Sequence, residues 1–155
     1  MYTHRSRGFT LIELLVVIAI IGVLSAVVLA SLNTARQKGN DAAIQSDLST
    51  IQTEAEIFYG GGGGNTIPNS YGVTVSTCAD ATGMFYLDSV IRKAIAGAES
   101  ANGTASSMSC FGSGTAYAIS SPLSSDAAKH WCVDSTGSVG VRTTGPATGT
   151  ECPAI

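Results

Sequence analysis

The chain has 155 residues, of which 45% are hydrophobic and only 12% are charged, and its formal net charge is −3. This length suits one modest domain with an appendage, and so little charge is unusual for a soluble domain of this size. The weak acidity argues against tight nucleic-acid binding by the chain, so no specific nucleic-acid partner is expected. Most of the apolar excess lies near the N-terminus, which indicates a membrane segment followed by a polar domain.

Residues 1–8 form a polar stretch with two arginines, Arg5 and Arg7, ahead of an apolar run over residues 9–32. As a helix the run can cross about 30 Å of hydrocarbon at about 1.5 Å per residue. The two arginines favour a cytoplasmic side for residues 1–8 and an outer side for everything beyond the run. A plain signal-anchor and a secretory signal peptide, whose apolar region spans about 7–15 residues, are the competing interpretations.

Glu13 is the one charged residue inside this run. A carboxylate there costs about 2.5–3.5 kcal/mol on insertion scales, and neither a signal peptide nor a passive anchor has a use for it. Such a residue needs a cationic partner, and the run contains no lysine or arginine. A cut after Gly8 would create a cation, because the new α-amine of Phe9 titrates at about 7.7–8 and is mostly protonated near neutrality.

The stretch Gly-Phe-Thr-Leu-Ile-Glu, from Gly8 to Glu13, resembles the processing signal of type IV prepilins and type II secretion pseudopilins, and the similarity extends to about residue 36. The resemblance implies that prepilin peptidase cuts between Gly8 and Phe9 and methylates the Phe9 amine. It also implies that Glu13 pairs with the Phe9 amine of a neighbouring subunit, with pairing inside one chain as the alternative. An unpaired carboxylate is penalised in an apolar core, so the pair would favour one subunit register.

Residues 33–59 are predicted to continue the helix as an amphipathic half, because five apolar residues recur there at steps of three and four. A kink or a helix restart is expected near Gly39–Asp41. The five glycines from Gly60 to Gly64 predict a helix stop and a flexible connector, and no Gly-Lys-Ser/Thr follows them to make a phosphate loop. The apolar stripe consists of Ile44, Leu48, Ile51, Ala55 and Phe58.

The remaining residues, 60–155, are expected to form a small α+β domain. Strand periodicity places Trp131 and Val133 on the face toward the helix, and Cys132 on the outer face with His130 and Asp134. The predicted elements are a helix over 84–96, a loop over 97–107, and strands over 116–119, 129–134 and 138–142, the last two joined by a turn.

All four cysteines lie in this domain, beyond the apolar run: Cys78, Cys110, Cys132 and Cys152. An even number outside a membrane indicates two disulfides in an oxidising compartment, with four reduced thiols as the alternative. Three pairings are possible, and Cys78–Cys110 with Cys132–Cys152 is favoured because each bond closes a local loop. No metal-binding spacing is present. His130, Cys132 and Asp134 share a face, but a cysteine in a disulfide is no nucleophile, so they are not expected to form a catalytic site. No catalytic residue, cofactor or enzymatic activity is expected.

The expected fold is α+β and pilin-like, with a long N-terminal helix packed on a small antiparallel sheet. The expected divisions are a removed leader over 1–8, a transmembrane and filament-core half-helix over 9–32, an amphipathic half-helix over 33–59, and a disulfide-bonded domain over 60–155.

The function that the resemblance implies is that of a structural subunit of a type IV pilus or a type II secretion pseudopilus. Such a subunit is stored in the cytoplasmic membrane as a single-pass protein, with its C-terminal domain outside, and is polymerised into a cell-surface or periplasmic filament. The implied partners are copies of itself and related pilins, prepilin peptidase, and an assembly-platform membrane protein with a cytoplasmic ATPase. The alternative is a membrane-tethered extracytoplasmic binding module that does not polymerise, but such a tether gains nothing from Glu13.

Overall fold

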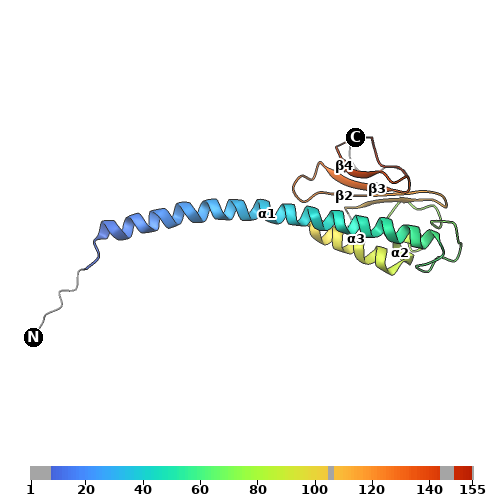
Figure 1. Ribbon diagram of the computed structural model, residues 1–155, viewed down its shortest axis with the longest axis horizontal. Helices are drawn as coiled ribbons and strands as arrows, with labels where there is room; N and C mark the ends of the chain where they lie inside the picture. Colours follow the sequence, from blue (N-terminus) through green and yellow to red (C-terminus); the bar gives the residue numbers. More distant parts are fainter. Residues whose placement is uncertain (1–7, 105–106, 144–148, 155) are drawn as a thin grey trace, which may run out of the picture. The chain divides into compact units, whose positions relative to one another are not determined.

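A computed structural model describes residues 8–104, 107–143 and 149–154. The chain divides into two compact units, Met1–Arg36 and Gln37–Ile155. Helix α1, Leu11–Tyr59, begins in the first unit and ends in the second (Figure 1). Apart from Gly8, the leader predicted over residues 1–8 lies outside the described residues.

In the first unit, every described residue from Gly8 to Arg36 is exposed. The α1 backbone satisfies its own hydrogen-bonding groups there, as a segment in lipid must, while the apolar side chains have no protein surface to pack on. By length and composition α1 is apolar enough to cross a membrane. The first half of α1 therefore draws its stability from its own backbone and from whatever apolar surroundings it meets.

The second unit holds a four-stranded antiparallel sheet in the order β1-β2-β3-β4. Each strand pairs with its neighbour in the chain, with Cys110 opposite Ile119, and Ile119 opposite Val133. Three of these strands are predicted by the sequence, whereas β1 is not, and β2 runs to Pro122 instead of ending at Ile119. The strands are β1 Ser109–Gly112, β2 Tyr117–Pro122, β3 His130–Asp134 and β4 Val139–Arg142.

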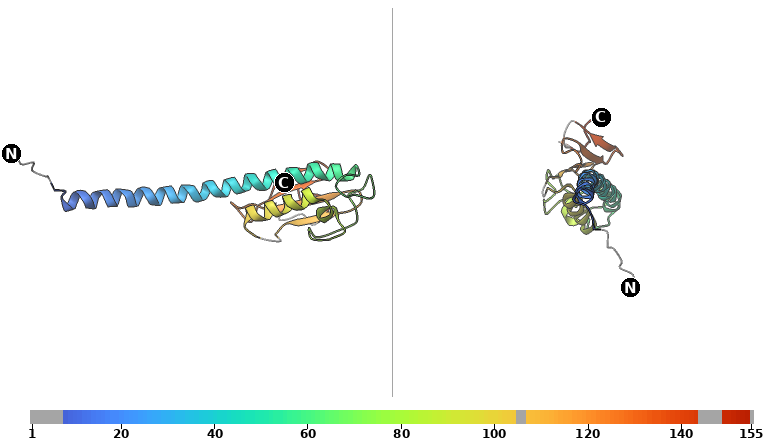
Figure 2. Two further views of the ribbon diagram at one scale, coloured as in Figure 1. Left: turned by 90° about the horizontal axis from the view of Figure 1, so that it is seen from below. Right: turned by 90° about the vertical axis from the view of Figure 1, so that its left-hand side faces the viewer.

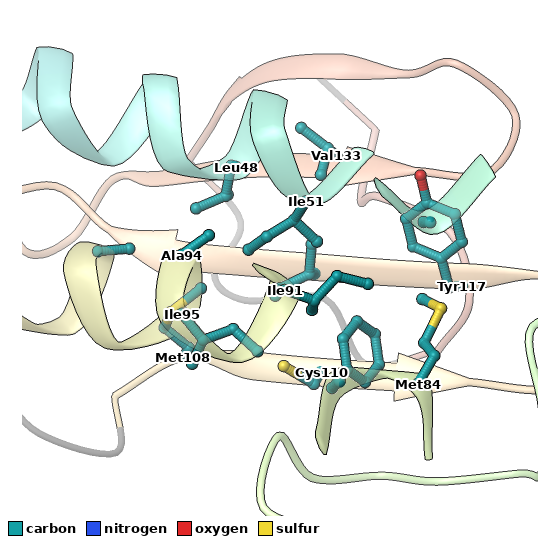
Figure 3. Packing of buried hydrophobic residues seen from close by; sticks show 14 of the residues in the cluster. Leu48, Ile51, Met84, Ile91, Ala94, Ile95, Met108, Cys110, Tyr117 and Val133 are labelled. Atoms are coloured by element: carbon teal, nitrogen blue, oxygen red, sulfur yellow. The ribbon is translucent and has the colours of Figure 1, made fainter. Parts of the chain in front are cut away.

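The main core lies where the second half of α1 and helix α3, Ser89–Asn102, run side by side over one face of the sheet (Figures 1 and 2). All five residues of the predicted α1 stripe are completely buried in it. Leu48 and Ile51 of α1 meet Ile91 of α3 and Val133 of β3 (Figure 3). The stripe is therefore the contact surface that attaches α1 to the rest of the second unit.

The helix restart expected at Gly39–Asp41 is wrong, because α1 continues through these residues. Polar groups at this point bind the connection between β2 and β3 instead. Asn40 Nδ2 donates a hydrogen bond to Ser124 Oγ over 3.4 Å. The Ser125 backbone N–H donates to Asp41 Oδ1 over 3.1 Å.

The single helix predicted over 84–96 is split in the structure into α2, Met84–Leu87, and α3. Asp88 has an extended backbone (φ −76°, ψ 125°) and acts as the N-cap of α3. Its Oδ1 accepts the backbone N–H groups of Val90 (2.7 Å) and Ile91 (2.9 Å). The loop predicted from residue 97 is also wrong at its start, since α3 continues to Asn102 and ends at Gly103 in the left-handed conformation (φ 77°).

The glycine run ends α1 as predicted, but it is a hydrogen-bonded turn structure. The N–H groups of Gly60, Gly61 and Gly62 donate to carbonyls in the last turn of α1. Asn65 then closes the loop, because its Nδ2 donates to the carbonyls of Phe58 (2.6 Å) and Ser70 (2.8 Å). The run is thus tied to the domain at both ends.

Candidate functional site

The start of α1 places Thr10 and Glu13 in reciprocal contact. Glu13 Oε2 accepts hydrogen bonds from the Thr10 backbone N–H (2.9 Å) and from Thr10 Oγ1 (2.8 Å). The Glu13 backbone N–H in turn donates to Thr10 Oγ1 over 3.3 Å. This is a capping box, in which the carboxylate is bound inside its own chain and lies near the positive end of the helix dipole.

The Gly8–Phe9 peptide bond lies just outside the helix. Both residues are exposed on non-helical backbone, and the Phe9 side chain is 86% accessible. No heavy atom lies within 4 Å of the position that a Gly8 Cβ would occupy. An accessible, non-helical segment is the kind of backbone that a peptidase can reach.

Gly8, Phe9 and Glu13, the three residues that the sequence singles out, therefore lie together at one helix start. Thr10 is a fourth residue at this place, and sequence reasoning missed it. Its signal is present as Thr-x-x-Glu directly before an apolar run, the pattern of a capping box. In the uncut chain the Phe9 nitrogen belongs to a peptide bond and carries no charge, so its pairing with Glu13 remains a prediction.

Large apolar side chains surround this helix start and continue along α1. Phe9 and Leu11 are the most accessible of them, at 86% each. A contiguous apolar surface of this kind is characteristic of a membrane or protein contact. Its exposed large residues are Phe9, Leu11, Ile12, Leu14, Leu15, Val16, Val17, Ile18, Ile20, Ile21, Val23, Leu24, Val27, Val28, Leu29 and Leu32.

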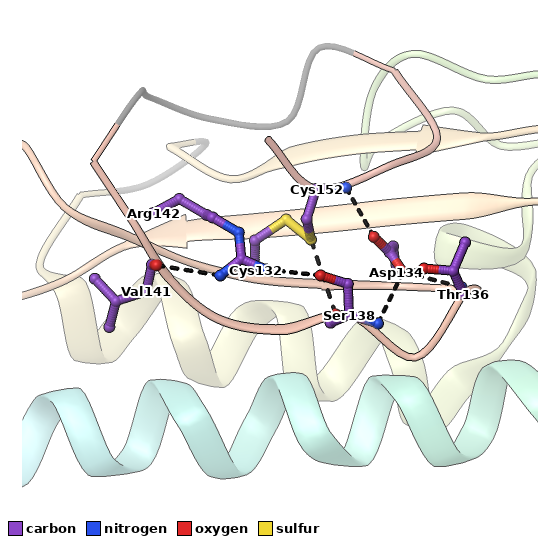
Figure 4. The surroundings of a disulfide bond; sticks show 7 residues. All are labelled: Cys132, Asp134, Thr136, Ser138, Val141, Arg142 and Cys152. Carbon is purple, nitrogen blue, oxygen red and sulfur yellow. Dashed lines mark hydrogen bonds between the residues drawn. A yellow bond between two sulfur atoms is a disulfide. The ribbon is translucent and has the colours of Figure 1, made fainter. Parts of the chain in front are cut away.

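Two disulfides stabilise the second unit, Cys78–Cys110 and Cys132–Cys152. They join the pairs that local loop closure favours. Cys132 lies on the outer face of β3 as expected, and the tail that carries Cys152 lies across that face and buries it (Figure 4). Val133, on the opposite face of β3, is buried in the main core, and Trp131 packs against that core.

The polar residues of β3 form no catalytic or metal-binding constellation. Cys132 is in a disulfide, and burial lowers the pKa of His130. Across the described parts of the chain, no group of three or more His, Cys, Asp or Glu side chains is arranged to hold a metal ion. Among the described residues, the helix start is therefore the candidate site.

A family profile described as the prokaryotic N-terminal methylation motif matches residues 3–29. The chain carries a prepilin-type methylation motif. The matched residues include Gly8, Phe9, Thr10 and Glu13, together with most of the exposed apolar surface. No solved structure matches the chain.

Curated proteins similar to this motif-bearing chain are filament subunits and secretion proteins by name. The type IV wide pilus major component of Thermus thermophilus is 50% identical over 55 residues, which make up 36% of this chain and 42% of that protein. The type IV major pilin protein of Myxococcus xanthus is 33% identical over 58 residues, or 37% of this chain and 26% of that protein. The type II secretion system core protein G of Dickeya chrysanthemi is 35% identical over 55 residues, or 36% of each chain.

Proposed function

We propose that this chain is a structural subunit of a type IV pilus or a type II secretion pseudopilus. The observation that carries the proposal is the exposed apolar segment over residues 9–32, which follows the Gly8–Phe9 bond and whose one charged residue is Glu13. The Gly8–Phe9 bond and Glu13 both lie inside the matched methylation motif. The similarity to two pilins and a secretion core protein supports the same class. Because those proteins are structural, the proposal includes no enzymatic activity.

In this proposal prepilin peptidase cuts between Gly8 and Phe9 and methylates the new amine. Cleavage converts an uncharged peptide nitrogen into an α-amine that is mostly protonated near neutrality. Methylation of an amine retains its positive charge. The mature N-terminus is then a cation four residues from the only carboxylate of the apolar segment.

The Phe9 amine of one subunit then pairs with Glu13 of a neighbour in the filament core. Breaking such a pair in an apolar environment leaves an uncompensated charge, which costs about 3–5 kcal/mol in buried sites. The pair therefore discriminates against subunits that dock out of register. Thr10 supplies hydrogen bonds to Glu13 within its own chain, so the carboxylate is not bare before a neighbour arrives.

Before assembly the chain is held in the cytoplasmic membrane by the first half of α1, as a single-pass protein with the second unit outside. Extraction into a filament requires an assembly-platform membrane protein and a cytoplasmic ATPase as partners. The apolar surface that contacts lipid in the stored subunit contacts neighbouring helices in the filament. Its complete exposure in the single chain fits both uses.

The processing step is tested by intact-mass measurement on protein recovered from its native host. The expected mass is that of a chain beginning at Phe9 with one added methyl group. A chain that begins at Met1, or one cut beyond residue 24, would contradict the proposal.

The assembly step is tested with Glu13→Val and Glu13→Gln, scored by electron microscopy of sheared filaments. Valine removes both the charge and the capping-box acceptor, whereas glutamine removes only the charge. Both variants should be cleaved and should fail to assemble, because neither has a carboxylate to pair with the Phe9 amine. Ile12→Val, a conservative change at an exposed neighbour, is the matched control and should assemble normally. Filaments from Glu13→Val at the control level would overturn the pairing, whereas a wild-type mature chain that never polymerises would be a membrane-tethered binding module.

A further inference from the structure

Asp134, at the end of β3, is a buried carboxylate with only 2% of its surface exposed. Its Oδ1 accepts the Thr136 backbone N–H (2.9 Å), the Thr136 hydroxyl (2.6 Å) and the Ser138 backbone N–H (3.1 Å). These bonds close the turn between β3 and β4. They hold the carboxylate in place with groups from the turn alone.

The second oxygen of the same carboxylate reaches the C-terminal tail. Asp134 Oδ2 accepts the backbone N–H of Cys152 over 2.8 Å (Figure 4). Cys152 is disulfide-bonded to Cys132, two residues before Asp134 in β3. One carboxylate therefore contacts both the turn beside one cysteine and the backbone of the other.

The carboxylate is ionised at neutral pH. Burial by itself would raise the pKa of Asp134, but hydrogen bonds from Cys152, Thr136 and Ser138 outweigh it and hold the pKa below its ordinary value. A hydrogen bond to a charged group is roughly twice as strong as a neutral one. The Cys152 N–H thus meets a strong acceptor that is oriented by the turn.

The sequence contains an internal counterpart. Asp80 follows Cys78 by two residues, as Asp134 follows Cys132, and a threonine follows each aspartate by two. Asp80 Oδ1 accepts the Thr82 N–H (2.9 Å) and hydroxyl (2.6 Å), the same turn at the same distances. The two aspartates differ in one respect. Among the described residues, Asp134 also accepts the backbone N–H of the cysteine that closes its disulfide, whereas the side-chain bonds of Asp80 go to Thr82.

We propose that Asp134 is a positioning residue for formation of the Cys132–Cys152 disulfide: it docks the tail through the Cys152 N–H while both cysteines are still thiols. The turn orients Oδ2 before the tail arrives. Docking brings the Cys152 sulfur beside Cys132, so the bond forms between partners that are already in place.

The covalent step is thiol–disulfide exchange with a disulfide oxidant, for which glutathione disulfide is the probe. One protein thiol loses its proton, and its thiolate attacks a glutathione sulfur, forming a mixed disulfide and releasing one glutathione thiolate, which takes up a proton. The second protein thiolate then attacks the protein sulfur of the mixed disulfide and releases the second glutathione. Two electrons pass from the two cysteines to glutathione disulfide, and Asp134 exchanges no electron or proton.

The first test measures the equilibrium for each disulfide separately, on full-length protein in detergent micelles, in glutathione buffers at neutral pH. Differential alkylation and peptide mass spectrometry report the reduced fraction of each pair. In Asp134→Asn the amide oxygen can take the place of Oδ1 and keep the turn, but the NH₂ group cannot accept the Cys152 N–H. The closing equilibrium of Cys132–Cys152 should fall about tenfold while that of Cys78–Cys110 is unchanged.

Asp80→Asn is the matched control, because it makes the same exchange of a carboxylate for an amide in the corresponding turn beside Cys78. It should shift neither equilibrium by more than about twofold, since the amide oxygen still accepts the two turn hydrogen bonds. An Asp134→Asn variant that shifts both disulfides alike has only lost overall stability, and this result would overturn the proposal. No shift at Cys132–Cys152 would also overturn it.

A second measurement leaves Asp134 intact. In the double variant Cys132→Ser with Cys152→Ser no covalent bond holds the tail, while Cys78–Cys110 remains. The amide at position 152 should still exchange with solvent at least about tenfold more slowly than an unstructured amide, because docking precedes the bond. Exchange at the unstructured rate, in a protein whose core amides stay protected, would contradict the proposal.

Discussion

Asp88 connects two elements through the two oxygens of one side chain. Its Oδ1 caps α3, and its Oδ2 lies against the backbone of Gly63. A Cβ built on Gly63 would overlap Asp88 Oδ2. Gly63 also has a left-handed backbone (φ 59°), which disfavours any side chain. The position therefore requires glycine for two separate reasons.

Gly63→Ala should lower the free energy of unfolding by about 2 kcal/mol or more, as the sum of left-handed strain and a disturbed N-cap. Gly103→Ala is the matched control, because Gly103 is also left-handed (φ 77°) but has no atom within 4 Å of its Cβ position. This control should cost only about 1 kcal/mol. Chemical denaturation of both variants measures the difference, and equal losses would contradict the role given to Asp88.

At the residue scale, the sequence predicts the roles of residues that depend on their neighbours in the chain. The predicted roles of Gly8, Phe9 and Glu13 follow from an ionisable group in an apolar run and from the resemblance of this stretch to prepilins, and they remain predictions. The favoured cysteine pairing follows from loop length, and the structure confirms it. The cap at Asp88 does not follow, because apolar spacing continues across it from Leu87 to Ile91. The bond from Asp134 to Cys152 joins residues 18 positions apart, which no local pattern reports.

At the element scale, the second half of α1 is held in place by its buried stripe. Ile51 lies at the centre of the stripe and is completely buried, in contact with residues of α3 and the sheet (Figure 3). Ile57 is on the same helix two turns later but is half exposed. The two isoleucines share their chemistry and helical context and differ in burial.

Ile51→Ala should reduce the free energy of unfolding by about 2–5 kcal/mol, since it removes buried methyl groups and leaves a cavity. Ile57→Ala should change it by no more than about 0.5 kcal/mol, as for other surface substitutions. Thermal and denaturant unfolding of the purified variants provide the measurement. Similar losses at both positions would mean that burial of the stripe does not carry the stability of this unit.

Elements with a strong period were predictable, whereas short ones were not. The α1 stripe repeats over five residues and was predicted completely. Strand β1 has four residues, Ser109–Gly112, and its pairing partner β2 determines its structure more than its own composition does. Helix α3 passes beyond its predicted end because Ala98 and its neighbours continue to pack on the core, which a propensity argument about Gly97 does not capture.

On the scale of the whole molecule, the two units depend on different environments. Every described residue of the first unit is exposed, and every buried residue of the described chain lies from Ile44 onward, in the second. Because the apolar surface of the first unit is exposed, we expect the full-length chain to need lipid or detergent to stay in solution. The core and both disulfides belong to the second unit.

A fragment that begins at Gln37 should therefore fold in aqueous buffer without detergent, with both disulfides formed and a cooperative melting transition. The full-length chain should aggregate under the same conditions. Near-ultraviolet circular dichroism and size-exclusion chromatography distinguish a folded monomer from an aggregate. A fragment with no cooperative transition would show that the second unit depends on the first for its stability.

The asparagine clamp at the end of the glycine run gives the run a fixed length. Asn65 spans the carbonyls of Phe58 and Ser70, so one glycine fewer would leave it too short to bridge them. Losing a glycine would also place asparagine where Gly64 now has φ 87°. A gain or loss of one glycine therefore alters a joint of defined geometry. Natural variation in the length of this tract should accordingly be rare.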